Sequence, residues 1–270
     1  MALFRTALLW LSVCVLAAAP AAAQVIEDDD SALQLEQPTF RLINLPTNLR
    51  LPRYKSNFDL THRFNLNLRE GSFTDLASNL FGLDNGATVG FEYRFAPIRR
   101  LQTSIYRVSA DRTIQLYAKY DAWRQRGSMP VSVSVLASVE GADNFQERHA
   151  PAVGAVVGRS FGNRASAYAT PVWVHNTAAL LGEDRDTFFV GFGGRFRIRP
   201  TVYVVAEMAP RVDGFKPNTT AYGFAIEKRA GGHLFQLNFN NGQGSTLGQI
   251  ARGGNPGQLY MGFNISRKFF

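Results

Sequence analysis

The chain ends with Gln-Leu-Tyr-Met-Gly-Phe-Asn-Ile-Ser-Arg-Lys-Phe-Phe, residues 258–270, in which apolar and polar side chains alternate. Leu259, Met261, Phe263 and Ile265 fall on one face, while the residues between them are polar, aromatic or small. Successive side chains of a β-strand point to opposite faces of the sheet, so this two-residue period predicts a strand with one apolar face. The strand is predicted to run into the aromatic pair that ends the sequence.

The same alternation recurs along most of the chain and predicts further strands of similar length. Together with the last one they number twelve, at residues 58–68, 87–95, 101–108, 113–123, 131–139, 152–161, 165–174, 188–198, 202–208, 219–228, 233–239 and 258–270. An even number of strands suits an antiparallel sheet whose first and last strands meet.

The connections between the predicted strands alternate in length. Those expected to be long are 69–86, 141–148, 176–186, 209–217 and 240–257, and those expected to be short are 96–100, 124–128, 162–164, 199–200 and 230–232. The connection at 110–112 is short and breaks this trend. Outer-membrane barrels have short turns on one side and longer loops on the other, whereas a soluble sandwich has no reason to sort its loops this way.

The N-terminal region has the features of an export signal. Arg5 precedes an apolar run, and the run leads into Ala21-Ala22-Ala23-Gln24, which resembles a processing site. We therefore expect a signal peptide at 1–23, a periplasmic arm at 24–55 with an acidic start, and a barrel at 56–270. Cys14 is the only cysteine and lies in the signal, so no disulfide or thiolate metal site is expected.

A membrane-spanning strand must pair all of its backbone groups within the protein, because lipid offers them no hydrogen-bond partner. No stretch beyond the signal reaches the roughly 18 apolar residues of a transmembrane helix. The predicted fold class is therefore all-β, a single antiparallel transmembrane β-barrel of about twelve strands with both termini in the periplasm. The predicted location is the bacterial outer membrane.

The polar phase of the strands contains charged residues of both signs, which on this assignment face the lumen. They are Asp59, Arg63, Glu92, Arg94, Lys119, Asp121, Arg195, Arg197, Glu207 and Glu227. Facing hydrocarbon, an Arg or Lys at the midplane would cost about 2–4 kcal/mol. These residues form either an internal network of ion pairs or the lining of a pore that selects solutes by charge. Their mixed signs favour mutual neutralisation.

Several short stretches resemble a family of uncharacterised bacterial membrane-bound β-barrel domains. They are His62-Arg63-Phe64, Leu80-Phe81-Gly82-Leu83-Asp84-Asn85-Gly86-Ala87, Lys119-Tyr120, Met129-Pro130-Val131 and the strand that contains Glu207. The resemblance covers about residues 40–270. It implies a barrel fold and an outer-membrane location. Since the family has no established activity, it implies no catalytic residue.

Other functional classes have less support in the sequence. The chain has 29 Lys and Arg against 21 Asp and Glu, for a net charge of +8, but the basic residues are scattered and form no nucleic-acid-binding motif. None of the four histidines has a serine two residues away on the same strand face, and no H-E-x-x-H spacing occurs. We predict no catalytic residue, metal site, cofactor or nucleic-acid partner.

The sequence thus favours a narrow passive channel or a structural barrel of unknown substrate. The alternatives are an outer-membrane lipid-modifying hydrolase and, third, an exported soluble β-sandwich that binds a partner. Expected partners are outer-membrane lipid, the barrel assembly machinery and small solutes or ions. In the first long connection, Phe73, Leu76, Ala77 and Leu80 have helical spacing and predict a short helix that either enters the lumen or packs on the rim.

Overall fold

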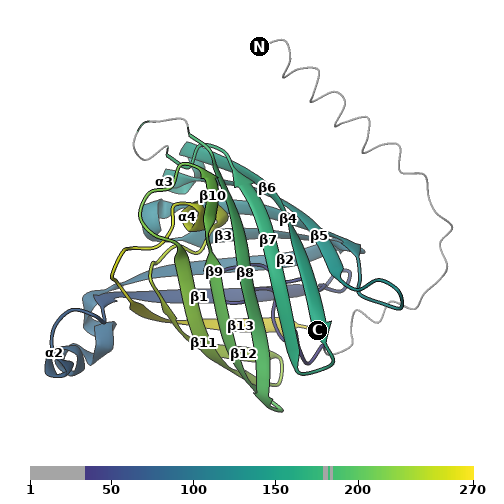
Figure 1. The fold of residues 1–270 in the computed structure, drawn as a ribbon, viewed down its shortest axis with the longest axis horizontal. Coiled ribbons are helices and arrows are strands. Elements are labelled where there is room, and N and C mark those ends of the chain that lie inside the picture. Colours follow the sequence, from purple (N-terminus) through teal and green to yellow (C-terminus); the bar gives the residue numbers. More distant parts are fainter. Residues whose placement is uncertain (1–33, 179–181, 183–184) are drawn as a thin grey trace, which may run out of the picture. The chain divides into compact units, whose positions relative to one another are not determined.

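The computed structural model of the chain describes residues 34–178, 182 and 185–270. The predicted signal peptide and the acidic run at 27–30 lie outside the described residues. Between residues 56 and 269 the chain forms one antiparallel β-sheet that closes on itself (Figure 1).

Twelve strands form the wall of the barrel, and a short thirteenth extends one of them. They are β1 (Ser56–Asn67), β2 (Ala87–Ile98), β3 (Leu101–Val108), β4 (Ile114–Trp123), β5 (Ser132–Gly141), β6 (Glu147–Phe161), β7 (Ala165–Val174), β8 (Thr187–Arg199), β9 (Val202–Ala209), β10 (Arg211–Gly214), β11 (Ala221–Ala230), β12 (His233–Asn240) and β13 (Tyr260–Phe269). Strand β10 follows β9 across Pro210 and pairs with the start of β8. The all-β fold and the twelve strands predicted from the sequence are confirmed.

Closure depends on the pairing of β1 with β13, which lie at opposite ends of the described sequence. Ser56 is opposite Phe269, and the register continues without a shift to Arg63 opposite Gly262. At the other side of the ring β8 pairs with β9, and β9 pairs with β11. Every wall strand therefore has a partner on both sides, and no edge is left open to lipid.

The two faces of the wall differ as the alternation predicts. Outward side chains are large and apolar, for example Phe91, Ile105, Leu116, Phe224 and Leu237, which are all exposed on the isolated chain. The residues between them point into the barrel and are mostly buried and polar. An apolar band around the outside and a polar interior are the arrangement of a barrel in a lipid bilayer.

The connections divide the barrel into two rims. The short-turn rim carries the connections at 99–100, 124–131, 162–164, 200–201 and 231–232, together with the start of β1 and the end of β13. The long-loop rim carries 68–86, 109–113, 142–146, 175–186, 215–220 and 241–259. The alternation of lengths holds except that 124–131 is longer than three of the connections on the long-loop rim.

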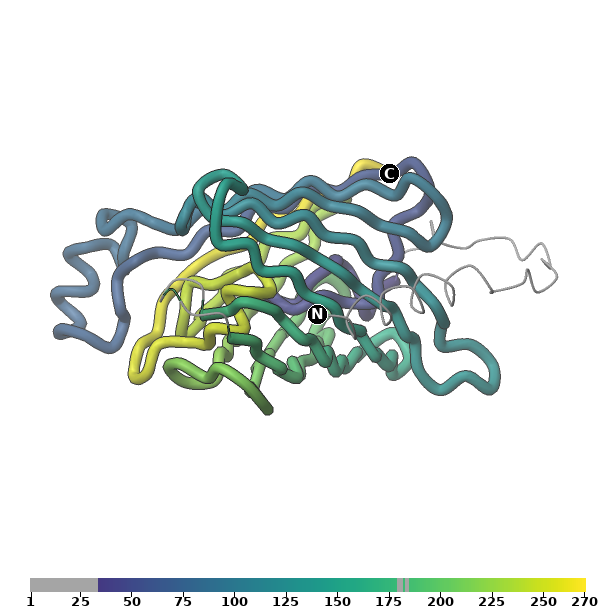
Figure 2. The backbone as a smooth tube through the Cα atoms, turned by 90° about the horizontal axis from the view of Figure 1, so that it is seen from above, coloured from purple at the N-terminus to yellow at the C-terminus, as the bar shows by residue number. Residues whose placement is uncertain are grey.

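The segment that precedes β1 does not lie outside the barrel. We call residues 34–51 the inner segment, because most of its side chains are buried within the ring of strands, including Phe40, Leu42, Ile43 and Leu49. Figure 2 shows this segment, in purple, among the strands. Residues 34–51 of the arm expected at 24–55 lie inside the barrel, where their apolar side chains and backbone groups find partners.

The helices lie in the loops of the long-loop rim. They are α2 (Phe73–Ser78), the 3-10 helices η2 (Leu80–Asn85) and η3 (Ala110–Arg112), α3 (Ala142–Phe145) and α4 (Leu247–Ala251). The predicted helix α2 forms, but it has no buried residue and projects away from the strands, so it neither enters the lumen nor packs its apolar side on the rim (Figure 1). By contrast, all five residues of α4 are buried. We call residues 241–259 the α4 loop.

Candidate functional site

The inner segment enters and leaves the lumen at the short-turn rim and turns back between Leu42 and Leu45. The Leu42 N–H donates to the Leu45 carbonyl at 2.8 Å, and the Thr47 N–H donates to the Phe40 carbonyl at 2.9 Å. Gln37 contacts Ser160 at one rim end of the segment, and the Tyr54 N–H donates to Ala96 beyond its other end. The segment is therefore a narrow hairpin with its tip inside the barrel.

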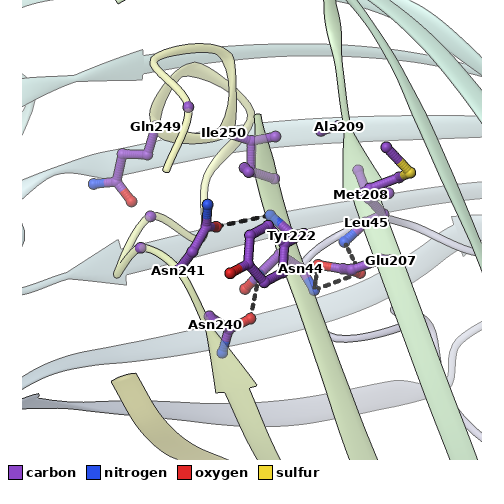
Figure 3. A pocket seen from close by; sticks show the side chains of 14 residues that line it. Asn44, Leu45, Glu207, Met208, Ala209, Tyr222, Asn240, Asn241, Gln249 and Ile250 are labelled. Carbon is purple, nitrogen blue, oxygen red and sulfur yellow. Dashed lines mark hydrogen bonds between the residues drawn. The ribbon is translucent and has the colours of Figure 1, made fainter. Parts of the chain in front are cut away.

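The tip of the hairpin is held by one carboxylate from the wall, that of Glu207 on β9. The backbone N–H of Ile43 donates to its carboxylate at 3.0 Å. The N–H groups of Asn44 and Leu45 donate to it at 2.9–3.1 Å (Figure 3). Consecutive N–H groups at a turn form a concave site for an anion. Glu207 thus satisfies three donors that the irregular backbone would otherwise leave unpaired in the lumen.

The backbone carbonyls of the inner segment are satisfied by donors from other wall strands. Arg195 donates to Arg41 O at 2.9 Å, Gln236 to Leu42 O at 2.7 Å and Asn264 to Ile43 O at 3.0 Å. On the opposite wall the Lys119 ammonium donates to the carbonyls of Thr47 and Leu49, at 2.7 and 3.0 Å. Irregular backbone at membrane depth is tolerated only when it is buried in protein and satisfied in this way.

The charged side chains also pair with one another. Arg195 makes a two-point contact with Glu227, at 2.6 and 2.9 Å, and both side chains are fully buried. Glu92 accepts from Arg94 and Ser104, each at 2.6 Å, and from Arg41 of the inner segment. The segment therefore contributes a charge to the network as well as backbone groups.

The lumen-facing residues predicted from the sequence lie where the alternation places them. Nine of the ten are at most 8% exposed, namely Asp59, Arg63, Glu92, Arg94, Lys119, Asp121, Arg195, Glu207 and Glu227. Arg197 is half-buried and lies two residues before the end of β8. Five of the nine, Arg63, Glu92, Lys119, Arg195 and Glu207, hydrogen-bond directly to the inner segment.

The α4 loop fills the lumen from the long-loop rim. The Gly248 N–H donates to the carboxylate of Glu140 at 3.0 Å, and Tyr106 donates to Ser245 at 2.7 Å. Leu247 and Ile250 join one apolar cluster with the hairpin tip and with wall residues such as Val172, Phe189 and Val205. The two insertions share this cluster within the barrel, so the lumen has a packed core.

The space between the hairpin tip and the α4 loop is small. A cavity of about 20 Å³ lies between the hairpin tip, β9 and the α4 loop, where Asn44, Glu207, Asn240 and Gln249 line it (Figure 3). About 10–15 Å³ of such volume holds one water molecule, so this cavity is too small for a solute. A second, polar hollow of about 330 Å³ opens at the short-turn rim beside Trp123 and is bounded by the inner segment.

Sequence reasoning missed the inner segment and the amides that bind it, Gln102, Gln236 and Asn264. One signal was present: a solvated arm has no use for Phe40, Leu42, Ile43, Leu45, Leu49 and Leu51 within twelve residues. The amides carry no such signal, because an uncharged polar residue on the inward phase is expected in any barrel.

Three of the four histidines lie in strands, and His175 directly follows β7. His62 points outward and stacks on Phe263, with ring centroids 4.6 Å apart, as expected for a ring packed on the apolar face. His175 contacts Asp186 at 2.6 Å in a half-exposed position. Among residues 34–178, 182 and 185–270, no group of three or more His, Cys, Asp or Glu side chains could hold a metal ion. In that same part of the chain no helix is long and apolar enough to cross a membrane.

The closed wall, its apolar outer face and its polar, occupied lumen define a membrane β-barrel. Residues 38–269 match the model of the family described as "Membrane bound beta barrel domain (DUF5777)". The chain belongs to this family, as the resemblance in the sequence predicted. The match includes most of the inner segment, so the segment is part of the family domain. Among curated proteins, none matches this sequence.

Solved structures similar to the chain include engineered variants of the porin of Rhodopseudomonas blastica. One such variant is 16% identical with a TM-score of 0.35, and another is 17% identical with a TM-score of 0.36. In each case the match covers 72% of this chain and 58% of the porin. A third match, also 17% identical, belongs to a study entitled "Asymmetric conductivity of engineered proteins". The chain thus spans somewhat more than half the length of these porins.

Proposed function

We propose that this protein is a bacterial outer-membrane β-barrel that keeps its own lumen closed, and that it acts as a structural barrel rather than as an open channel. The observation that carries the proposal is the filled lumen: the inner segment and the α4 loop meet in one apolar cluster, and the cavity left between them is about 20 Å³. No hydrated ion or nutrient fits through such a space.

The strength with which the inner segment is held supports the same proposal. Burying an aliphatic side chain stabilises by about 1.5–3 kcal/mol, and Leu42, Ile43 and Leu45 are all at most 2% exposed. The three N–H bonds to Glu207 and the carbonyl bonds from Arg195, Lys119 and Gln236 add to this. Spontaneous withdrawal of the hairpin is expected to be rare.

The location and orientation are part of the proposal. A barrel with an apolar outer band is typical of the bacterial outer membrane, and residues 1–23 have the sequence features expected of an export signal. Periplasmic turns in such barrels are short. We therefore assign the short-turn rim, with Ser56 and Phe269, to the periplasmic side and the long-loop rim to the cell exterior.

A gated passive channel is the second candidate, and the charged lumen wall favours it. If the lumen were always closed, apolar side chains could fill it without the large desolvation cost of burying ion pairs. Nine charged wall residues would instead form a hydrophilic pore if the hairpin withdrew. In this reading the inner segment is the gate.

Planar-bilayer recordings of the refolded chain from Gln24 to Phe270 test the proposal. We expect no steady single-channel steps from the intact protein, while heat-modifiable gel migration shows that the barrel has formed. A variant that lacks residues 34–51 should conduct, because the wall remains and the α4 loop loses the hairpin tip against which Leu247 and Ile250 pack. Steady, ion-selective steps from the intact protein would contradict a closed structural barrel.

A cysteine pair distinguishes the two candidates. Asn48 of the inner segment donates to Ser134 of β5 at 2.8 Å, so Asn48→Cys with Ser134→Cys places two thiols in contact. If the segment is a gate, voltage-induced openings appear in the reduced protein and disappear on oxidation. A structural barrel shows the same closed trace in both states.

A further inference from the structure

The short-turn rim carries an unusual distribution of charge. Each of its five connections, taken with the three residues before it, contains two Arg or Lys residues, for example Arg99 with Arg100 and Lys228 with Arg229. In these five stretches the only Asp or Glu is Asp121, which points into the lumen and is 2% exposed. The residues before β1 and the end of β13 add Arg53, Lys55 and Arg267, whereas Lys268 places its ammonium over the ring of Phe40 inside the barrel.

Backbone contacts join these stretches into a continuous ring around the barrel. The Arg197 N–H donates to the Arg164 carbonyl at 2.7 Å, and the Arg229 N–H donates to the Thr201 carbonyl at 2.8 Å. The Lys268 N–H donates in turn to the Gly232 carbonyl at 3.0 Å. The cations therefore lie at one level of the barrel, and we call those outside the lumen the basic belt. Arg197 and Arg229 are on the inward phase of β8 and β11 and are not part of it.

Aromatic side chains fix the depth of the basic belt. Arg53 lies over the ring of Tyr54, Arg159 over that of Phe161 and Arg267 over that of Phe269, at 4.3, 5.4 and 6.0 Å from the ring centroids. These rings are more than half exposed and lie at the ends of strands. Exposed aromatics at strand ends form the girdle at the level of the lipid headgroups, so the cations lie at the depth of the lipid phosphates.

The long-loop rim provides the contrast. There the basic residues alternate with acidic ones, and Arg112 pairs with Asp143 at 2.6 Å while Arg148 contacts Glu147 at 3.2 Å. The excess of positive charge is thus specific to one rim and does not follow simply from the basic composition of the chain.

We propose that the basic belt binds the headgroups of anionic phospholipids in the leaflet that surrounds the short-turn rim. The belt follows the circumference, as the lipids do, and presents guanidinium and ammonium groups at phosphate depth beside apolar rings that contact the upper acyl chains. Arginine donors match phosphate oxygens in a planar, two-point geometry. A phospholipid with a net negative charge is bound more tightly than a zwitterionic one because it adds attraction over the whole belt.

The test is the lipid selectivity of the refolded full-length mature chain in phosphatidylcholine vesicles. Spin-labelled phosphatidylglycerol and spin-labelled phosphatidylcholine report the fraction of each lipid that is immobilised at the barrel surface. We expect a several-fold preference for phosphatidylglycerol that decreases as salt is raised, since exposed charges are screened over about 8 Å at physiological ionic strength.

A variant that lacks four cations of the basic belt, and a matched control, show which rim is responsible for the lipid preference. The variant Arg100→Gln/Arg159→Gln/Lys228→Gln/Arg267→Gln should reduce the preference toward one. The control Arg69→Gln/Arg112→Gln/Arg148→Gln/Lys216→Gln removes the same charge from the long-loop rim and should leave the preference unchanged. If the first variant does not fold, either of its two-residue halves should lose part of the preference.

Two outcomes would overturn the proposal. One is equal immobilisation of the two lipids by the wild-type chain, which would leave a soluble acidic polymer as the partner of the basic belt. The other is an equal loss of preference in the variant and in the control, which would show that net charge alone sets the selectivity.

Discussion

The barrel is closed from its two ends by elements that are held in different ways. The inner segment has no regular secondary structure. Wall side chains such as Glu207, Arg195 and Lys119 hydrogen-bond to its backbone N–H and carbonyl groups. The α4 loop is held mainly by apolar packing of Leu247 and Ile250, and a capping box from Thr246 to Gln249 satisfies the start of its helix. Both elements share the apolar cluster, but the first has more charged partners on the wall than the second, for which Glu140 is one.

The difference follows from how each element is joined to the barrel. The α4 loop continues into β12 and β13 at both ends, so its position is restricted by the chain itself. The inner segment continues into the barrel wall only at β1. A segment joined at one end needs more specific contacts to stay in place, and directional hydrogen bonds to charged groups supply them. The variants that follow test this contrast in order of decreasing effect.

The largest effect is expected from Arg195→Met. This change leaves the Glu227 carboxylate buried without its partner and removes the bond to the Arg41 carbonyl. Breaking a buried ion pair from one side costs about 3–5 kcal/mol, and the loss should appear in urea unfolding in detergent micelles.

Two further variants serve as controls for Arg195→Met. In Arg195→Met/Glu227→Leu, removing both charges should recover most of the lost stability. Arg112→Met breaks the exposed pair with Asp143 and should cost less than about 1 kcal/mol. If Arg195→Met were as stable as the wild type, the Arg195–Glu227 pair would not be desolvated in the way that the structure indicates.

The second effect is expected from Ile250→Ala in α4. The side chain is 4% exposed within the apolar cluster, and truncating a buried isoleucine costs about 2–5 kcal/mol. Unfolding in urea measures the loss, and Phe73→Ala in the exposed helix α2 is the control, with almost no change expected. Ile250→Ala should remain closed in bilayer recordings, because the hairpin still fills the lumen. Frequent conductance steps would show instead that α4 is the gate.

The smallest effect is expected from Glu207→Gln. An amide offers one acceptor oxygen where the carboxylate offers two, so part of the bonding to the hairpin tip is lost at a cost of about 1–3 kcal/mol. Since 1.4 kcal/mol is a factor of ten, hydrogen exchange at Ile43, Asn44 and Leu45 should accelerate by about five- to a hundredfold. Exchange in α4 should not change, and a uniform acceleration in both elements would contradict separate attachment.

The strands could be predicted because their signal is local. The alternation of Phe224, Ile226 and Lys228 with Gly223, Ala225 and Glu227 reports the two faces of β11 without reference to any other strand. The main differences are at β6, which begins at Glu147 rather than at 152, and at β10, which continues the pairing past Pro210. In both places the partner strand decides the boundary, and the local pattern does not.

The site could be predicted only in part, for a physical reason. The inward phase identified Glu207, Lys119 and Arg195, but it did not show what they bind. The partners lie far away in sequence: 162 to 164 residues from Glu207, 70 to 72 from Lys119 and 154 from Arg195. The segment 34–51 has no periodicity, since its groups are satisfied by side chains from many strands and not by a sheet. Only its apolar composition indicated that it is buried.

The seam between β1 and β13 has a consequence for the order of biogenesis. The hairpin is connected to Ser56, which pairs with Phe269, the last residue of β13. Closing this seam joins parts of the chain that are more than 200 residues apart, which makes it a slow step. If the hairpin has already docked on the inner face of the growing sheet, it is enclosed when β1 pairs with β13. If it is still outside at that point, it must enter a barrel that is already closed. Early docking of the inner segment therefore gives the faster route to the native barrel.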